Sequence, residues 1–200
     1  TSFHEELISD FIKSELNKNQ IDFIVDEWGN IEVLLKGKSD KEIVYISHMD
    51  HPGFEIVEKI DGKLFKAKTL GGLPKLCDIE NTNIKTVSTD NQIKGNLLIN
   101  DNETNSNEFK FTNSDRWLNK EFVFIELDNE NIDYPCPVVF DLPDSKIDKD
   151  EVITPVADDL AGCALILETL KILKNTDIKY SIRAIFSRAE EVGLLGARLI

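Results

Sequence analysis

The sequence has few cysteines. Only three stand among its 200 residues, at Cys77, Cys136 and Cys163, and no two of them form a Cys-x-x-Cys pair. Three widely spaced cysteines provide neither a disulfide framework nor a thiolate zinc site. Because disulfides are rare in reducing compartments, we expect the protein to be cytoplasmic.

Basic residues and long apolar runs are also scarce. Lys and Arg total 23 against 37 Asp and Glu, so the formal net charge is −14 at pH 7. This balance argues against nucleic acid as a partner, because phosphate binding needs clustered Lys and Arg. No apolar run approaches the roughly 18 residues that span a bilayer, and the first ten residues do not resemble a signal peptide. We therefore expect no membrane partner.

Residues 1–72 have the pattern of the first part of an α/β domain. Apolar side chains over residues 3–16 follow helical spacing and predict a helix that packs by one face. Strands are predicted at residues 21–25 and 31–35, around a reversal at Trp28-Gly29-Asn30. The continuous apolar run at residues 43–46 predicts a central strand buried on both faces.

Residues 73–150 have a different pattern and predict a small inserted β domain. Just before this block, Asp61-Gly62 separates two alternating runs, which is typical of a hairpin. Short β-like runs then follow at residues 84–87, 93–99, 122–127 and 138–140. The stretch at residues 100–115 is rich in Asn, Ser, Thr and charge, and predicts a solvated loop.

The α/β pattern returns in residues 151–200. It predicts a buried helix at 160–173 with Asp159 as its cap, a strand at 180–186 and a second helix at 190–200. The predicted fold is therefore α/β, with a central, mostly parallel sheet flanked by helices and interrupted by the β domain. Since the last predicted helix has no terminating residue, we expect the chain to be truncated at its carboxyl end.

Three short clusters lie where a predicted strand ends or a predicted helix begins. They are Ser47-His48-Met49-Asp50, Asp158-Asp159 and Glu190-Glu191. Such positions converge on one crevice in open α/β sheets. Each cluster alone has a structural explanation, as a satisfied histidine or as acids in the first turn of a helix. Together, a histidine and two sources of carboxylate fit zinc, cobalt or manganese, and an unligated glutamate fits a base.

The order of these motifs resembles that of the TET-type aminopeptidases, the family that includes glutamyl aminopeptidases and proteins once labelled endoglucanases. The matching stretches are DEWGN at 26–30, ISHMDHPGF at 46–54, LGG at 70–72, DDLAGC at 158–163 and EEVGLLGA at 190–197. The resemblance implies an aminopeptidase with two divalent metal ions, zinc or cobalt. In that family pattern His48 binds one ion, Asp158 bridges both and Glu191 binds the other.

The resemblance implies further roles. Glu190 would be the general base, Asp50 would orient His48, and the Asp158-Asp159 peptide is a candidate for cis geometry. The substrates would be peptides, and the inserted β domain would mediate homo-oligomer formation. The family has an acidic residue where this chain has His51 and an Arg where it has Leu160. The remaining Asp and His ligands of the family fall beyond residue 200, so we expect the chain alone to be inactive.

Two other functions stay open at this point. One is a dipeptidase or an N-acyl amino acid deacylase that uses the same metal site on a different substrate. The other is a noncatalytic family member whose inserted domain mediates assembly. The presence of both Glu190 and Glu191 argues against a decayed site.

Overall fold

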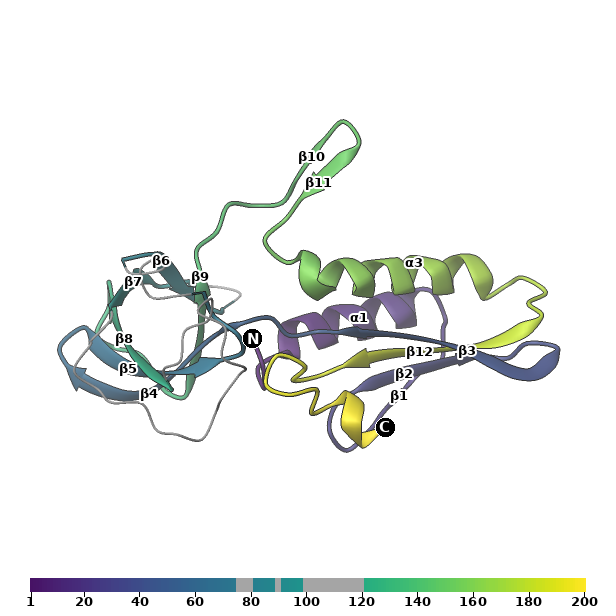
Figure 1. Cartoon of the computed structure of the whole chain (residues 1–200), viewed down its shortest axis with the longest axis horizontal. Coiled ribbons are helices and arrows are strands. Elements are labelled where there is room, and N and C mark those ends of the chain that lie inside the picture. Colours follow the sequence, from purple (N-terminus) through teal and green to yellow (C-terminus); the bar gives the residue numbers. More distant parts are fainter. Residues whose placement is uncertain (75–80, 89–90, 99–120) are drawn as a thin grey trace. The chain divides into compact units, whose positions relative to one another are not determined.

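The computed structural model describes residues 1–74, 81–88, 91–98 and 121–200 (Figure 1). Contacts within the chain divide them into two compact units. One unit consists of Ser2–His51 and Ser145–Ile200, and the other of Thr1 and Pro52–Asp144. Three sequence features lie outside the described residues: Cys77, the predicted loop at 100–115 and the end of the predicted strand at 93–99.

The first unit is built on a four-stranded sheet with the order β1-β2-β12-β3. The strands are β1 (Ile24–Val25), β2 (Ile31–Leu35), β3 (Ser39–His48) and β12 (Tyr180–Ser187). Only β12 and β3 pair in parallel, whereas the β1-β2 and β2-β12 pairs are antiparallel. The described strands therefore do not form the mostly parallel sheet that we expected. Short connections at 26–30 and 36–38 reverse the chain, because a parallel return needs a crossover of a dozen or more residues.

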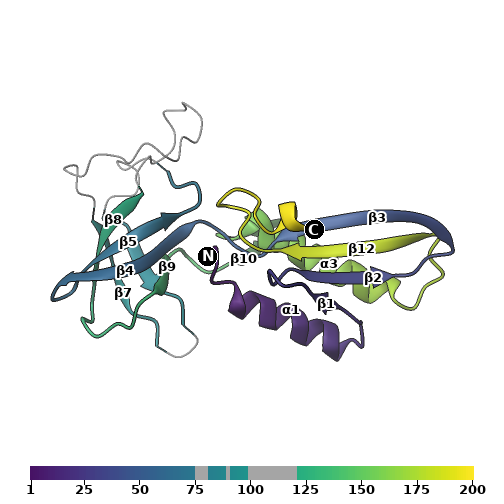
Figure 2. The same ribbon diagram turned by 90° about the horizontal axis from the view of Figure 1, so that it is seen from below.

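Two helices cover one face of this sheet, α1 (Glu6–Lys18) and α3 (Gly162–Leu173) (Figure 2). On β12, Ile182, Ala184 and Phe186 alternate along the strand and all face the helices. The helices contribute Ile12, Leu16, Cys163, Ile166, Leu167 and Leu170 to the same core. The predicted helices at 3–16 and 160–173 thus exist, with each beginning later than expected.

Strand β3 does not have the burial that we predicted for residues 43–46. It is the last strand of the described sheet, and Val44 and Ile46 are 54% and 49% exposed. An apolar run indicates that a strand favours burial, but its place in the sheet depends on pairing with distant segments. The prediction of a strand buried on both faces is therefore wrong for the described chain.

The end of the chain does not form the predicted helix at 190–200. Residues after β12 form turns and a single 3-10 turn, η2 (Ala197–Leu199). Ala189, Gly193 and Leu194 have φ angles of 51°, 114° and 59°. A right-handed helix cannot include such residues, because each reverses the local twist of the backbone.

Two short elements before α3 were not predicted. Strands β10 (Lys146–Asp148) and β11 (Glu151–Ile153) form an antiparallel hairpin that is too short and too charged to give a clear apolar pattern. A kinked turn, η1 (Ala157–Ala161), then leads into α3, and the backbone angles of Asp158 and Asp159 within it are not helical.

Among the described residues, no helix combines the length and the apolar character needed to cross a bilayer.

The second unit is a closed barrel with the strand order β4-β5-β8-β7-β6-β9. Its strands are β4 (Gly53–Asp61), β5 (Leu64–Leu70), β6 (Asn83–Thr86), β7 (Lys94–Leu98), β8 (Phe122–Leu127) and β9 (Cys136–Phe140). The Asp61-Gly62 hairpin prediction is confirmed, since β4 and β5 pair across it. The unit begins at Pro52 rather than at 73, because β4 pairs with β9 and β5 with β8.

The core between α3 and the sheet generates a first prediction. Leu170 is 0% exposed, whereas Leu165 in the same helix is 70% exposed. We expect Leu170→Ala in the 200-residue chain to lower the free energy of unfolding by about 2 to 5 kcal/mol, because it leaves a cavity. Leu165→Ala should change it by no more than about 0.5 kcal/mol. Urea unfolding followed by circular dichroism measures both, and equal losses would contradict this description of the core.

Candidate metal centre

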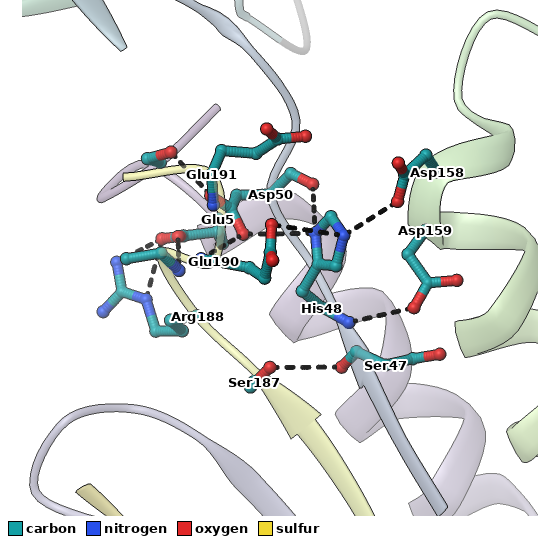
Figure 3. A network of polar contacts seen from close by, with 12 residues as sticks. Glu5, Ser47, His48, Asp50, Asp158, Asp159, Ser187, Arg188, Glu190 and Glu191 are labelled. Carbon is teal, nitrogen blue, oxygen red and sulfur yellow. Dashed lines mark hydrogen bonds and ion pairs between the residues drawn. The ribbon is translucent and has the colours of Figure 1, made fainter. Parts of the chain in front are cut away.

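Polar side chains meet at the carboxyl ends of β3 and β12 (Figure 3). These two strands are parallel neighbours, and His48 at the end of β3 is in register with Ser187 at the end of β12. The segments that leave the two strands carry Asp50 and the Glu190-Glu191 pair. Because parallel strands end at the same edge of a sheet, sequence-distant groups are brought together there.

His48 is fixed on both sides of its ring. Its Nε2 atom lies 3.0 Å from Oδ1 of Asp158 and 3.7 Å from Oε2 of Glu190. Its Nδ1 atom lies 2.9 Å from the backbone carbonyl oxygen of Asp50 and 3.4 Å from the Asp50 carboxylate. The ring is thus held by Asp50 through Nδ1, while Nε2 faces the other acidic groups.

His48, Asp158 and Glu191 form a donor set that suits a divalent metal ion. One ligand atom from each lies within 4.8 Å of the other two. One imidazole nitrogen and two carboxylate oxygens are a common set for zinc and similar ions. The Asp158 side chain is 86% exposed, so the centre is open on that side. The geometry fits the predicted ligands, and their role as ligands stays a prediction.

Two of the carboxylates have pKa values shifted in opposite directions. Burial alone would raise the pKa of Asp50, but hydrogen bonds from His48, from Ser2 and from two backbone N–H groups hold it at about 2. For Glu191, burial followed by the nearby charge of Glu190 raises the pKa to about 7, and the charge of His48 opposes this shift only in part. A cation beside Glu191 would relieve the repulsion between its carboxylate and that of Glu190.

The imidazole responds to the same charges. Burial would lower the pKa of His48, but hydrogen bonds with Asp50 and Asp158 outweigh burial and raise it to about 9. The protonated ring therefore supplies the positive charge of the metal-free centre. A metal ion has to displace this proton, because imidazole binds metals in its neutral form.

The segment that carries Asp158 approaches β3 closely. The Asp158-Asp159 peptide bond is cis, as the resemblance led us to expect. Oδ2 of Asp159 accepts a hydrogen bond of 3.3 Å from the backbone N–H of His48. A Cβ atom on Gly162 would lie 2.2 Å from Oγ of Ser47 and 2.3 Å from Oδ1 of Asp159, so only glycine fits there.

Asp159 does not act as the helix cap that we predicted. The amino end of α3 has no side-chain cap among the described residues, and the Asp159 carboxylate instead accepts the hydrogen bond from β3. The Cys163 thiol also contacts this strand, donating to the carbonyl oxygen of His48 at 3.2 Å. Both contacts tie η1 and α3 to the end of β3.

We predicted that Asp50 would orient His48, but Asp50 also contacts three other residues of the centre. Its carboxylate accepts hydrogen bonds from Oγ of Ser2 at 2.5 Å and from the backbone N–H groups of Glu190 and Glu191 at 2.9 and 3.2 Å. No sequence pattern pointed to Ser2 as part of the site. Ser2 is 48 positions before Asp50 in the sequence and belongs to no motif that we identified.

A histidine and several carboxylates that meet at one sheet edge are a set of side chains that divalent-metal hydrolases use. The family model of the M42 glutamyl aminopeptidases matches residues 29–200. The chain therefore belongs to the M42 glutamyl aminopeptidase family. The family resemblance seen in the sequence is thereby confirmed.

Several known proteins are similar to this chain along nearly all of its length. A curated protein of Acetivibrio thermocellus named "Putative aminopeptidase" is 28% identical over 205 residues, which cover 98% of this chain and 57% of that protein. The Pyrococcus horikoshii TET1 peptidase, which can assemble into a tetrahedron or a large octahedral shell, is 24% identical with a TM-score of 0.77. An aminopeptidase from Desulfurococcus kamchatkensis is 19% identical with a TM-score of 0.74.

The two solved structures match this chain over its whole length, but the match covers only part of each of them. The two structures are matched over 100% of this chain, and over 60% and 55% of their own chains. The chain thus spans little more than half the length of its relatives. The structural likenesses establish a shared fold.

The two raised pKa values predict how metal affinity depends on pH. A bound ion displaces the proton of His48, with a pKa of about 9, and that of Glu191, with a pKa of about 7. Affinity should therefore rise with pH by about tenfold per unit between these two values, and more steeply below the lower one. Competition with a chromophoric chelator measures it in the intact protein. Affinity that is constant or falls over this range would contradict the assignment, and Glu191→Gln should remove the extra steepness.

Proposed function

We propose that this chain is part of a metal-dependent aminopeptidase that hydrolyses amino-terminal residues from peptides. The observation that carries the proposal is the meeting of His48, Asp158 and Glu191 beside Glu190, in a chain that belongs to the M42 family. The aminopeptidase names of two relatives support the same activity. The preferred substrates are peptides with a free amino terminus.

Three residues would hold the metal. His48 would bind one ion, Glu191 the other, and Asp158 would bridge the two, since its exposed carboxylate offers two oxygens. When bound, two divalent ions, zinc or cobalt, would supply the Lewis acidity that activates water and polarises the peptide carbonyl.

The hydrogen bonding of His48 suits it to this task. Its Nδ1 faces the backbone carbonyl oxygen of Asp50, so Nδ1 carries the proton that it donates. Once a metal ion has displaced the proton of Nε2, the neutral ring would keep its proton on Nδ1 and present the lone pair of Nε2 on the side of Asp158. An acceptor on the far nitrogen fixes the ring and raises its basicity as a ligand.

Glu190 is the proposed general base. Its Oε2 lies 3.7 Å from Nε2 of His48, and its side chain is 33% exposed, so it borders the centre and also reaches solvent. It is not part of the three-residue donor set. A carboxylate in this place accepts a proton from the attacking water and passes it to the leaving amine.

We also propose that the protein forms homo-oligomers through the barrel unit. The assembly of the TET1 peptidase of Pyrococcus horikoshii into a tetrahedron or an octahedral shell supports oligomer formation. A closed barrel has no unpaired strand edges, so its contacts would be made by side chains rather than by sheet extension.

Two glutamate variants of the intact enzyme test the proposed roles. Glu190→Gln should keep the metal content and lower turnover by about 100-fold to 10,000-fold, because it keeps the shape and removes the base. Glu191→Gln should instead lower the metal content. Metal analysis and turnover of a peptide with a free amino terminus measure the two effects.

The same assay separates the proposed function from its alternatives. N-acetylated peptides should not be hydrolysed, since their hydrolysis would favour a deacylase. Near-normal turnover in Glu190→Gln would remove that residue from the mechanism. A wild-type enzyme that binds metal and hydrolyses neither substrate would support a noncatalytic role.

A further inference from the structure

Four consecutive backbone N–H groups, from Arg188 to Glu191, are held by buried side chains. Arg188 donates to Oδ1 of Asn30 at 3.0 Å, and Ala189 donates to Oε1 of Glu5 at 3.0 Å. Glu190 and Glu191 donate to the two carboxylate oxygens of Asp50. The three accepting residues are 2%, 2% and 0% exposed, in the order Asn30, Glu5 and Asp50. We call Asn30, Glu5 and Asp50 the backbone clamp.

The clamp draws on three separate parts of the chain. Asn30 lies in the turn between β1 and β2, Glu5 precedes α1, and Asp50 follows β3. All three converge on the segment that follows β12. A chain segment held at every N–H group has little freedom to change its direction.

The conformation of this segment needs such support. Ala189 has a φ angle of 51°, in the left-handed region that residues with a Cβ atom seldom adopt. Residues persist in that region only where surrounding contacts over-determine them. Ala189 immediately precedes Glu190 and Glu191, so its backbone angles set the direction in which that pair leaves the sheet.

Glu5 is itself held in place by the segment that it supports. Nε of Arg188 donates to Oε2 of Glu5 at 2.7 Å, and the backbone N–H of Phe3 donates to Oε1 at 3.0 Å. Arg188 also donates through Nη2 to the carbonyl oxygen of Phe3 at 2.9 Å. The buried charge of Glu5 is therefore compensated by the residue next to Ala189 (Figure 3).

Asn30 is fixed in a similar way. Its Nδ2 group donates to Oδ2 of Asp26 at 2.7 Å and to the carbonyl oxygen of Gly196 at 3.2 Å. Its Oδ1 atom then remains directed at Arg188. Asn30 thus joins the beginning of the loop, at Arg188, to its end, at Gly196.

We propose that Glu5 and Asn30 are positioning residues of the metal centre, which act by fixing the backbone from which Glu190 and Glu191 project. The inference rests on the proposed roles of those two glutamates. Glu5 reaches them through Ala189, and Asn30 through Arg188. Neither residue belongs to the donor set of His48, Asp158 and Glu191. Their removal lets the loop relax, and groups that orient ligands in this way affect both metal affinity and rate.

The test compares Glu5→Ala and Glu5→Gln with a matched control. Glu15 lies in the adjoining helix α1 and pairs with Lys171 at 2.8 Å, away from the loop. In the intact enzyme, Glu5→Ala should lower metal affinity and kcat by about 10-fold to 100-fold, with KM changed no more than about twofold. Glu5→Gln keeps an oxygen for Ala189 and should recover most of the loss. Glu15→Ala should leave all three quantities within about twofold.

Amide hydrogen exchange of the metal-free protein provides a readout that does not depend on activity. Glu5→Ala should speed exchange at residues 188–191 by about 10-fold to 100-fold, since a hydrogen bond to a charged group is lost. Glu15→Ala should leave exchange there unchanged. If Glu5 only stabilised helix α1, Glu5→Ala and Glu15→Ala would both speed amide exchange throughout α1, and exchange at 188–191 would not differ between them.

Unchanged exchange at 188–191 in Glu5→Ala, or equal losses of metal affinity in Glu5→Ala and Glu15→Ala, would overturn the proposal. If Glu5→Ala does not fold, Asn30→Ala carries the same test, because it removes the acceptor for Arg188. A wild-type protein without metal affinity would overturn the proposed function, while the exchange comparison would still decide whether the clamp holds the loop.

Discussion

The carboxylate of Asp50 is fully buried, and a buried charge is stable only where hydrogen bonds replace the water that it has lost. Those bonds come from three directions: the Ser2 hydroxyl, the backbone N–H groups of Glu190 and Glu191, and the imidazole of His48. The same interactions that stabilise the charge join the amino-terminal segment, the end of β3 and the loop after β12. The arrangement of the centre therefore follows from the need to satisfy one carboxylate.

The parallel pairing of β3 with β12 in the described sheet makes this arrangement possible. Because β3 and β12 run in the same direction, His48 and Ser187 end side by side, and the chain leaves both strands at the same edge. The antiparallel neighbour β2 begins at this edge, since Ile31 pairs with Phe186, and the turn before it brings Asn30 to the loop. The directions of the strands thus place His48 among the candidate metal ligands and Asn30 where it holds the backbone of the loop after β12.

The sequence predicted the parts of the structure that depend on short patterns. Strands β2 and β8 have the bounds that were expected from the runs at 31–35 and 122–127, because the apolar side chains there mark a buried surface. The candidate ligands His48, Asp158 and Glu191 were likewise found from local motifs and their order along the chain. The structure brings these three side chains together.

Long-range contacts decide the rest, and they leave no local pattern. The hydrogen bonds of Glu5 to Ala189 and of Asn30 to Arg188 join residues 184 and 158 positions apart, so neither supporting role was predictable from its neighbours in sequence. The helix predicted at 190–200 failed for a related reason. Leu194 favours a helix by composition, but here it has a φ angle of 59° in a turn whose position is fixed by those distant contacts.

Asp50 and Glu191 show how one small centre can give two carboxylates different properties. They have similar intrinsic acidity and both are removed from much of the solvent, yet the pKa of Asp50 is lowered to about 2 and that of Glu191 is raised to about 7. The difference lies in the donors around them: the protein provides Asp50 with several, whereas Glu191 faces the negative charge of Glu190. Asp50 is thus satisfied by the fold itself. Among the described residues, burial and the charge of Glu190 raise the pKa of Glu191 more than the charge of His48 lowers it, and such a carboxylate is suited to bind a cation in the proposed enzyme.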